Sequence, residues 1–149
     1  MRKNNIYNNK IEVSYKFSIM GNSTSKQNIA NFEDVQRFVL ATDHVILNVM
    51  DTVDQDTLIL KTLSAVAEVD ALNTLMDDGE FDRKILVYGR NSGDVEKVLK
   101  KQKQLVALGF TEVYVYLGGL FEWVLLQDIY GAELFKTTRH VADILRYKK

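Results

Sequence analysis

The chain has 149 residues, of which 46% are hydrophobic, and its formal net charge at pH 7 is −1. This composition predicts one folded domain with a real core, and the near-neutral charge gives no electrostatic basis for nucleic-acid binding. The chain contains no cysteine, which excludes disulfides, thiolate metal sites and thiol catalysis. No apolar run approaches the ~20 residues of a membrane helix, so we expect a cytoplasmic protein.

The first 28 residues are expected to form an N-terminal extension, and residues 29–149 the folded domain. Residues 11–19 alternate strictly between apolar and polar side chains, which is the pattern of a β-strand and predicts an extra strand at a sheet edge. Residues 20–28 are polar and are expected to form a linker.

Gly21 follows Met20 and lies four residues before Ser25, a spacing that fits N-myristoylation. The motif functions only if translation begins at Met20, so that Gly21 becomes the N-terminal residue. Two interpretations stay open, namely lipidation that recruits the protein to a membrane and coincidence. One myristoyl chain gives only marginal membrane binding, and Lys26 is the only base close to the motif.

From residue 29 onward, helix and strand patterns alternate along the chain. The expected helices are 31–41, a helix capped by Ser64 and stopped at 77–79, 94–108, 120–130 and a weaker one at 140–147; the expected strands are 45–50, 58–60, 85–88 and 113–116. This alternation predicts the α/β class, with a parallel sheet covered by helices on both faces. Parallel strands end at one edge, where sites form, so Gly89 and Gly118 should lie near that edge.

For two of the expected helices, the sequence also predicts which faces are buried. The helix after Ser64 should bury one apolar side, made of Val66, Val69, Leu72, Leu75 and Met76. The helix at 120–130 is apolar almost all round, so it is either a buried core helix or a helix with an exposed face for a partner.

The second half of the chain carries a distinctive order of features. The strand 85–88 is followed by Gly89, then come Gly109-Phe110, the strand 113–116, Gly118-Gly119 and Trp123. This order resembles the second half of a rhodanese-like domain, in which a catalytic cysteine follows the first of these strands. The resemblance implies a three-layer α/β domain with a central, mainly parallel sheet, in which Gly89 occupies the position of the cysteine.

The loop Gly89, Arg90, Asn91, Ser92, Gly93 and Asp94 corresponds to the active-site loop of that family. The resemblance implies that its backbone amides form a cradle for an anion or a thiolate at a helix N-terminus. Glycine can form neither a persulfide nor a phosphocysteine, and Ser92 would need an adjacent base, so we expect no catalytic residue. The loop is interpreted as a ligand-binding loop with Arg90 as its charged partner, as a protein-docking surface, or as a plain tight turn.

An earlier stretch departs from the family pattern, because Asn48 and Met50 stand where the family often has an acid and a base. The resemblance therefore implies a catalytically inactive domain that binds an unknown protein partner or a small anion. Two alternatives stay open: a sulfurtransferase-like or phosphatase-like enzyme of altered chemistry, and a membrane-recruited scaffold lipidated at Gly21. No cofactor is expected, and no metal, because neither histidine lies at a ligand spacing.

Overall fold

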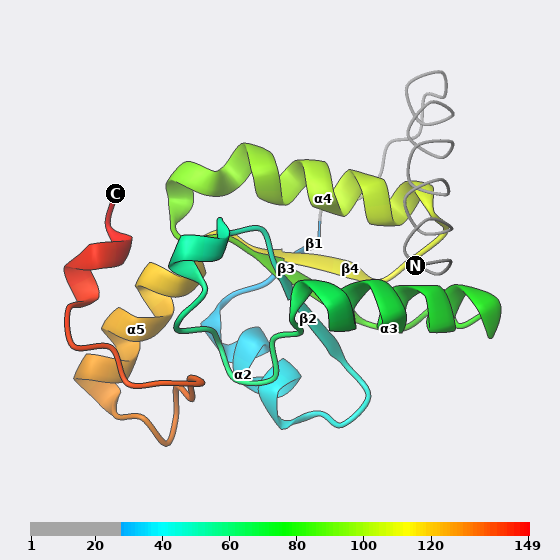
Figure 1. Ribbon diagram of the computed structural model, residues 1–149. Helices are drawn as coiled ribbons and strands as arrows, with labels where there is room; N and C mark the ends of the chain where they lie inside the picture. The colour runs from blue at the N-terminus through cyan, green and yellow to red at the C-terminus, as the bar shows by residue number, and fades with distance from the viewer. Residues whose placement is uncertain (1–27) are drawn as a thin grey trace.

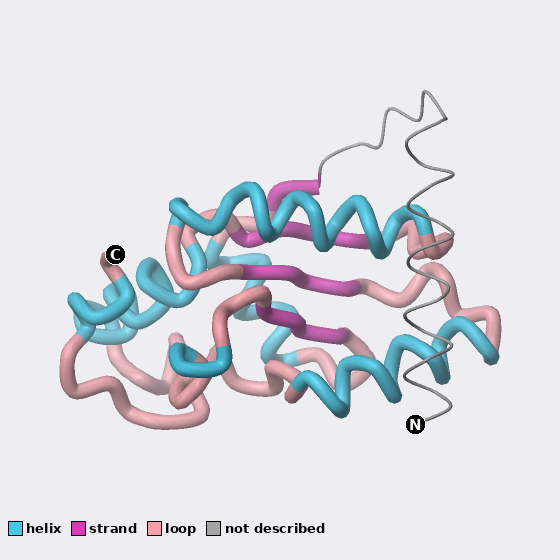
Figure 2. The backbone as a smooth tube through the Cα atoms, turned by 45° about the horizontal axis from the view of Figure 1, so that its top comes forward, coloured by secondary structure: helices cyan, strands magenta, loops and turns pink. Residues whose placement is uncertain are grey.

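The computed structural model describes residues 28–149, so the predicted strand 11–19, the linker up to residue 27 and Gly21 lie outside the described residues. Four strands form one sheet in the order β1-β4-β3-β2, and every neighbouring pair is parallel. The strands are β1 (Asn28–Ile29), β2 (Val45–Asn48), β3 (Ile85–Tyr88) and β4 (Val113–Tyr116). Figure 2 shows them side by side. Because all the pairs are parallel, the carboxyl ends of the strands lie at one edge of the sheet.

Helices cover both faces of this sheet (Figure 1). They are α2 (Phe32–Leu40), α3 (Ala65–Asp77), α4 (Val95–Ala107) and α5 (Gly119–Tyr130), with three 3₁₀ turns, η1 (Thr52–Asp54), η2 (Ser92–Asp94) and η3 (Ile144–Tyr147). The chain steps from β2 to β3 to β4 in one direction, so right-handed crossovers place α3 and α4 on the same face. The step from β1 to β2 runs the opposite way and places α2 on the other face.

Each face of the sheet has its own hydrophobic core, because successive residues of a strand point to opposite sides. Leu86, Tyr88 and Tyr116 pack with α2 and α5, whereas Val87 and Val115 pack with α3 and α4. The inner strand β3 is buried on both sides, which explains why it is an unbroken apolar run. The predicted three-layer α/β architecture with a parallel sheet is confirmed.

Side-chain caps fix where two of the helices begin. Asn31 and Asp34 form a reciprocal capping box at the start of α2, with N–O distances of 2.9 and 3.0 Å. The Oγ of Ser64 accepts a hydrogen bond from the amide of Ala67, so the predicted cap of α3 is confirmed.

Three details of the sequence prediction are wrong. Residues 58–60 form no strand but a single bridge from Ile59 to Thr137, because the amide of Ile59 donates to the Tyr88 hydroxyl and not to a strand. Residues 140–147 contain only the turn η3. Val66 is 67% exposed, since it lies in the first turn of α3 while the buried face begins further along, at Leu72.

His44 precedes β2 and packs its ring on Phe38, with the ring centroids 4.7 Å apart. Its Nε2 lies 3.6 Å from the Oδ1 of Asp43, and its side chain is 19% exposed. Burial lowers the pKa of His44; the charge of Asp43 opposes this shift, and the charges of Lys84, Arg83 and Lys61 add to it.

We expect the domain to lose stability as the pH falls below about 6.5, because unfolded His44 takes up a proton more readily than folded His44. His44→Gln should reduce the difference in urea-unfolding free energy between pH 7.5 and 5.5. The matched control is His140→Gln, since His140 is exposed and should leave the difference unchanged. An equal pH dependence in wild type and H44Q would contradict this role.

Candidate functional site

The loop Gly89–Asp94 lies between β3 and α4 at the carboxyl edge of the sheet. The start of α5 is bonded directly to it: the amide of Leu120 donates to the Gly89 carbonyl at 3.0 Å, and the amide of Phe121 donates to the Arg90 carbonyl at 2.8 Å. The turn that contains Gly118 and Gly119 therefore meets the loop at one edge, as the positions of Gly89 and Gly118 after parallel strands predicted.

A carboxylate of the same loop fills its interior. The amide of Arg90 donates to Oδ2 of Asp94 at 2.7 Å. A Cβ atom added at Gly89 would lie 2.5 Å from the Cβ of Asp94 and 3.0 Å from its Oδ2, which is closer than van der Waals contact allows. Position 89, where the resemblance places the family's cysteine, thus has no room for any side chain beside Asp94.

Asn91 ties the loop to itself and to the end of the described chain. Its Oδ1 accepts a hydrogen bond from the amide of Gly93, and its Nδ2 donates to the Tyr147 carbonyl, both at 2.7 Å. Asn91 and Gly89 are buried, whereas Ser92 and Gly93 are exposed. The tip is therefore the most exposed part of the loop, whereas Arg90 and Asp94 are half-buried, and binding of a small anion inside the loop requires Asp94 to move. Anion binding stays a prediction.

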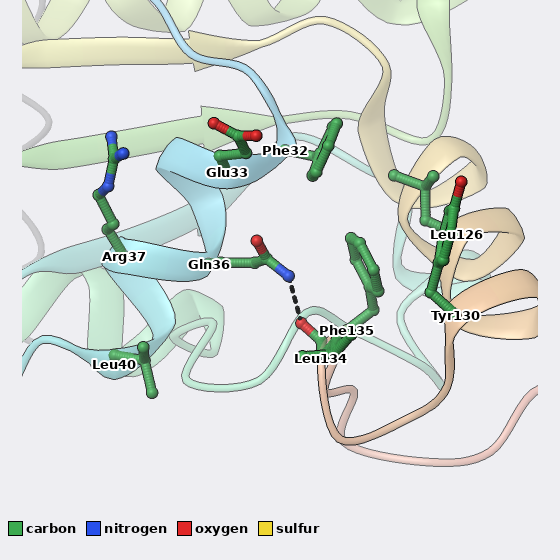
Figure 3. Close-up of a pocket in the computed structure, with 9 residues that line it drawn as sticks. All are labelled: Phe32, Glu33, Gln36, Arg37, Leu40, Leu126, Tyr130, Leu134 and Phe135. Carbon is green, nitrogen blue, oxygen red and sulfur yellow. Dashed lines mark hydrogen bonds between the residues drawn. The ribbon is translucent and has the colours of Figure 1, made fainter.

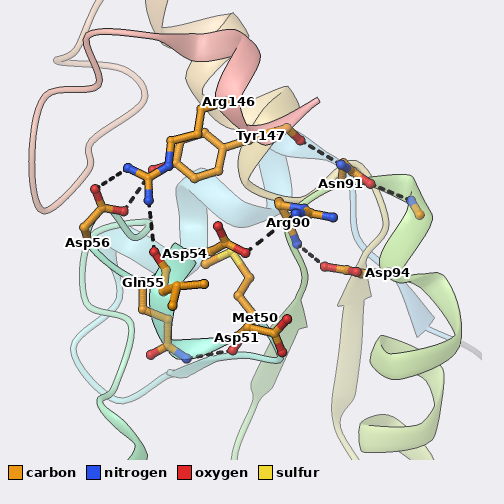
Figure 4. Close-up of polar contacts among 12 residues, drawn as sticks. Met50, Asp51, Asp54, Gln55, Asp56, Arg90, Asn91, Asp94, Arg146 and Tyr147 are labelled. Carbon is orange, nitrogen blue, oxygen red and sulfur yellow. Dashed lines mark hydrogen bonds and ion pairs between the residues drawn. The ribbon is translucent and has the colours of Figure 1, made fainter. Parts of the chain in front are cut away.

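Three ion pairs link the acidic turn after β2 to neighbouring elements, and Figure 4 shows two of them, Asp54 with Arg90 and Asp56 with Arg146. Asp51 lies 3.7 Å from Lys97 of α4, and Asp54 lies 3.6 Å from Arg90. Asp56 lies 2.6 Å from Arg146 of η3. The charge of Arg90 is already directed at a carboxylate, so an anionic ligand would compete with Asp54 for it.

The turn η3 packs against this edge. Arg146 donates to Asp56 and to the Val53 carbonyl, and Tyr147 is 1% exposed. Burial acts to raise the pKa of Asp56, but the hydrogen bond and charge of Arg146 lower it on balance. The sequence analysis missed this contact because the partners lie 90 residues or more apart in the chain and no local motif marks them.

Asn48 and Met50, the two residues that depart from the family pattern, bring no charge to this part of the fold. Oδ1 of Asn48 accepts a hydrogen bond from the amide of Met50 at 3.0 Å. Met50 is 6% exposed and belongs to the core below α2 and α5. A neutral amide and an apolar side chain therefore stand where the resemblance placed an acid and a base.

A second feature is an apolar groove of about 610 Å³ beside α2 and α5. Figure 3 shows its walls, with Gln36 donating to the Leu134 carbonyl across one end. The exposed members include Leu40 (75%), Tyr130 (62%) and Leu134 (58%). The helix α5 buries Trp123 on its inner side and exposes Ile129 on its outer side. The buried-core interpretation therefore holds for the inner face, and binding of a partner by the outer face stays a prediction.

Within residues 28–149, no three acidic, histidine or cysteine side chains are arranged to hold a metal ion. None of the helices in that range is both long enough and apolar enough to cross a membrane. Gly21 lies outside the described residues, so its lipidation stays a prediction.

No protein-family model matches the sequence, and no curated protein matches it. Among solved structures, the Anabaena protein Alr3790 matches at a TM-score of 0.50 and 19% identity, over 80% of this chain and 98% of that chain. A Rhodanese_3-like domain of the same Anabaena protein matches at 25% identity and a TM-score of 0.43, over 64% of this chain and 99% of that chain.

The likeness to Alr3790 at a TM-score of 0.50 agrees with the architecture of the described residues, a parallel sheet between two layers of helices. The protein is thus an α/β domain of the three-layer class. Within that class its fold is similar to that of the Anabaena protein Alr3790, in agreement with the rhodanese-like fold that the order of motifs from Gly89 to Trp123 implied.

Proposed function

We propose that this protein is a catalytically inactive rhodanese-like domain that acts as a binding or regulatory module. The observation that carries this proposal is the lack of space at Gly89, where an added Cβ would lie 2.5 Å from the Cβ of Asp94. The chain has no cysteine that could act from another position. Sulfane-sulfur transfer needs a thiolate nucleophile, and neither the residue nor the room for it is present.

The proposed contact surface is the loop Gly89–Asp94. Its tip, Ser92 and Gly93, is exposed, while Asp94 fills its interior. A protein partner can contact the tip without disturbing Asp94, whereas a small anion has to displace that carboxylate. The geometry therefore favours a protein partner over a small anion.

The direct test of inactivity is turnover by the purified protein, with thiosulfate and cyanide as sulfur-transfer substrates and p-nitrophenyl phosphate as a phosphatase substrate. We expect no rate above the protein-free background in either assay. Turnover that scales with protein concentration and persists after a further purification step would contradict the proposal. Loss of such turnover in Ser92→Ala would assign it to the loop and favour the altered-chemistry enzyme.

The contact surface has a separate test, crosslinking in the native cells followed by comparison of two variants. Ser92→Trp places a large side chain at the loop tip, and Lys103→Trp places the same side chain on the exposed surface of α4. A partner of the loop should be lost from S92W and retained by K103W. A partner retained by both variants would place the contact elsewhere.

A further inference from the structure

We propose that Asp94 is a built-in occupant of the former active-site loop, which holds the loop closed to external anions and makes glycine necessary at position 89. This inference concerns how the proposed binding loop is regulated, and it rests on the proposed function only for the identity of that loop. Its tests measure folding and amide signals, so they can fail or succeed independently of the turnover assay.

The first step is the direction in which the Asp94 carboxylate points. Asp94 is the N-cap residue of α4, a position where an aspartate ordinarily accepts a hydrogen bond from an amide of the first helical turn. The Asp94 side chain makes no such bond. Its Oδ2 instead accepts from the amide of Arg90, at 2.7 Å, four residues back. The carboxylate therefore forms its hydrogen bond with the loop and not with the helix.

The second step is electrostatic. The carboxylate sits at the N-terminal end of a helix of 13 residues, where the helix dipole stabilises negative charge. The Arg90 amide supplies a hydrogen bond to the same oxygen. A negatively charged group is thus already held where the loop and the helix both favour one, and a second anion would be repelled by it.

The third step is steric, and it links two positions. The atom that a new side chain at Gly89 would strike first is the Cβ of Asp94, at 2.5 Å. That atom is fixed by the backbone at the start of α4, so a rotation of the Asp94 side chain cannot move it away. A side chain at position 89 and any side chain at position 94 therefore exclude one another.

The stability test is a set of Gly89→Ala comparisons in three backgrounds. In the wild-type background G89A should lower the folding equilibrium constant about tenfold or more, the usual effect of overpacking a buried site. In the Asp94→Gly background the same change should lower it by about threefold or less, because the blocking Cβ is gone. Asp94→Ala is the matched control: it removes the carboxylate but keeps the Cβ, so G89A should remain as damaging as in wild type.

Equal effects of G89A in all three backgrounds, or no effect in wild type, would overturn the steric part of the proposal. In each background, the folding equilibrium constant of the G89A variant is compared with that of the protein that carries only the change at position 94. The cost of that change therefore cancels.

The occupancy test follows the backbone amide signals of Arg90 and Gly93 by NMR while inorganic sulfate is added. Wild-type signals should not shift, whereas those of D94A should shift and saturate, because the Arg90 amide has lost its acceptor. Asp51→Ala is the control, since it removes one negative charge from the same edge without opening the loop. Saturable shifts in wild type, no shift in D94A, or equal shifts in D51A and D94A would each overturn the proposal.

Discussion

Replacing Gly119 by alanine is expected to destabilise the domain by roughly 3 kcal/mol or more. Gly119 has φ = +67°, a left-handed conformation that L side chains rarely adopt. Its Cβ would lie 2.5 Å from the Gly89 carbonyl oxygen and 3.0 Å from the Arg90 carbonyl carbon. Both are backbone atoms of the candidate loop, so the clash is relieved only if the loop or α5 moves.

The control for this prediction is Gly79→Ala. Gly79 has nearly the same φ, +72°, but an added Cβ would have nothing within 4 Å. We expect a loss of about 1 kcal/mol, which is the cost of the left-handed conformation alone. Urea unfolding of both variants separates conformational strain from the contact with the loop. Equal losses would show that α5 and the loop are not packed as closely as described.

Replacing Trp123 by alanine is expected to cost about 3–5 kcal/mol. Trp123 is 0% exposed, and its ring centroid lies 4.9 Å from that of Phe135 in an edge-on arrangement. Its Nε1 donates to the Lys136 carbonyl at 3.0 Å. The change leaves a cavity below α5 and removes one of the hydrogen bonds that hold the segment after Phe135 against the domain.

Ile129→Ala is the matched control for Trp123, because Ile129 lies on the same helix and is 62% exposed. Its truncation should change the free energy of unfolding by no more than about 0.5 kcal/mol. Trp123→Phe keeps a ring but loses the hydrogen bond to Lys136, and its loss should fall between those of the two alanine variants. Comparable losses in I129A and W123A would contradict the assignment of the inner and outer faces of α5.

The fold was predictable where the local pattern and the global fold agree. Residues 85–88 and 113–116 are apolar because both of their faces are covered, so their limits could be predicted from the sequence and match β3 and β4. Ser64 is a cap residue in sequence and in structure. The position of Gly89 after β3 also followed from the order of elements.

Other features could not be predicted because they depend on partners far away in the chain. The strand β1 has only two residues, too few to show a period, and it exists because β4 offers a parallel edge. The apolar run 58–60 has the composition of a strand, but its backbone bonds to Tyr88 and to Lys136. Val66 fits a helical period, yet the first turn of α3 is exposed.

The closing of the candidate loop was also invisible in the sequence. An aspartate just before a helix predicts an ordinary cap. The sequence does not tell whether its carboxylate points forward to the helix or back to the loop. The pairing of Asp54 with Arg90 likewise joins two loops that only the sheet brings together. Side-chain direction and loop-to-loop contact therefore decide whether this loop is open or closed.

The central claim is that the loop keeps the geometry of an anion-holding loop and that Asp94 is its occupant. The most direct test is the pKa of a cysteine introduced at position 89 in the double variant G89C/D94G, measured from the pH dependence of alkylation. The chain has no other cysteine, so the signal comes from one thiol; Lys103→Cys in wild type supplies an exposed reference.

We predict that the thiol at position 89 has a pKa clearly below the ordinary value of about 8.5, because the loop amides and the start of α4 stabilise the thiolate once Asp94 is removed. The reference thiol at position 103 should show the ordinary value. A pKa at position 89 equal to that reference, or above it, would contradict the account.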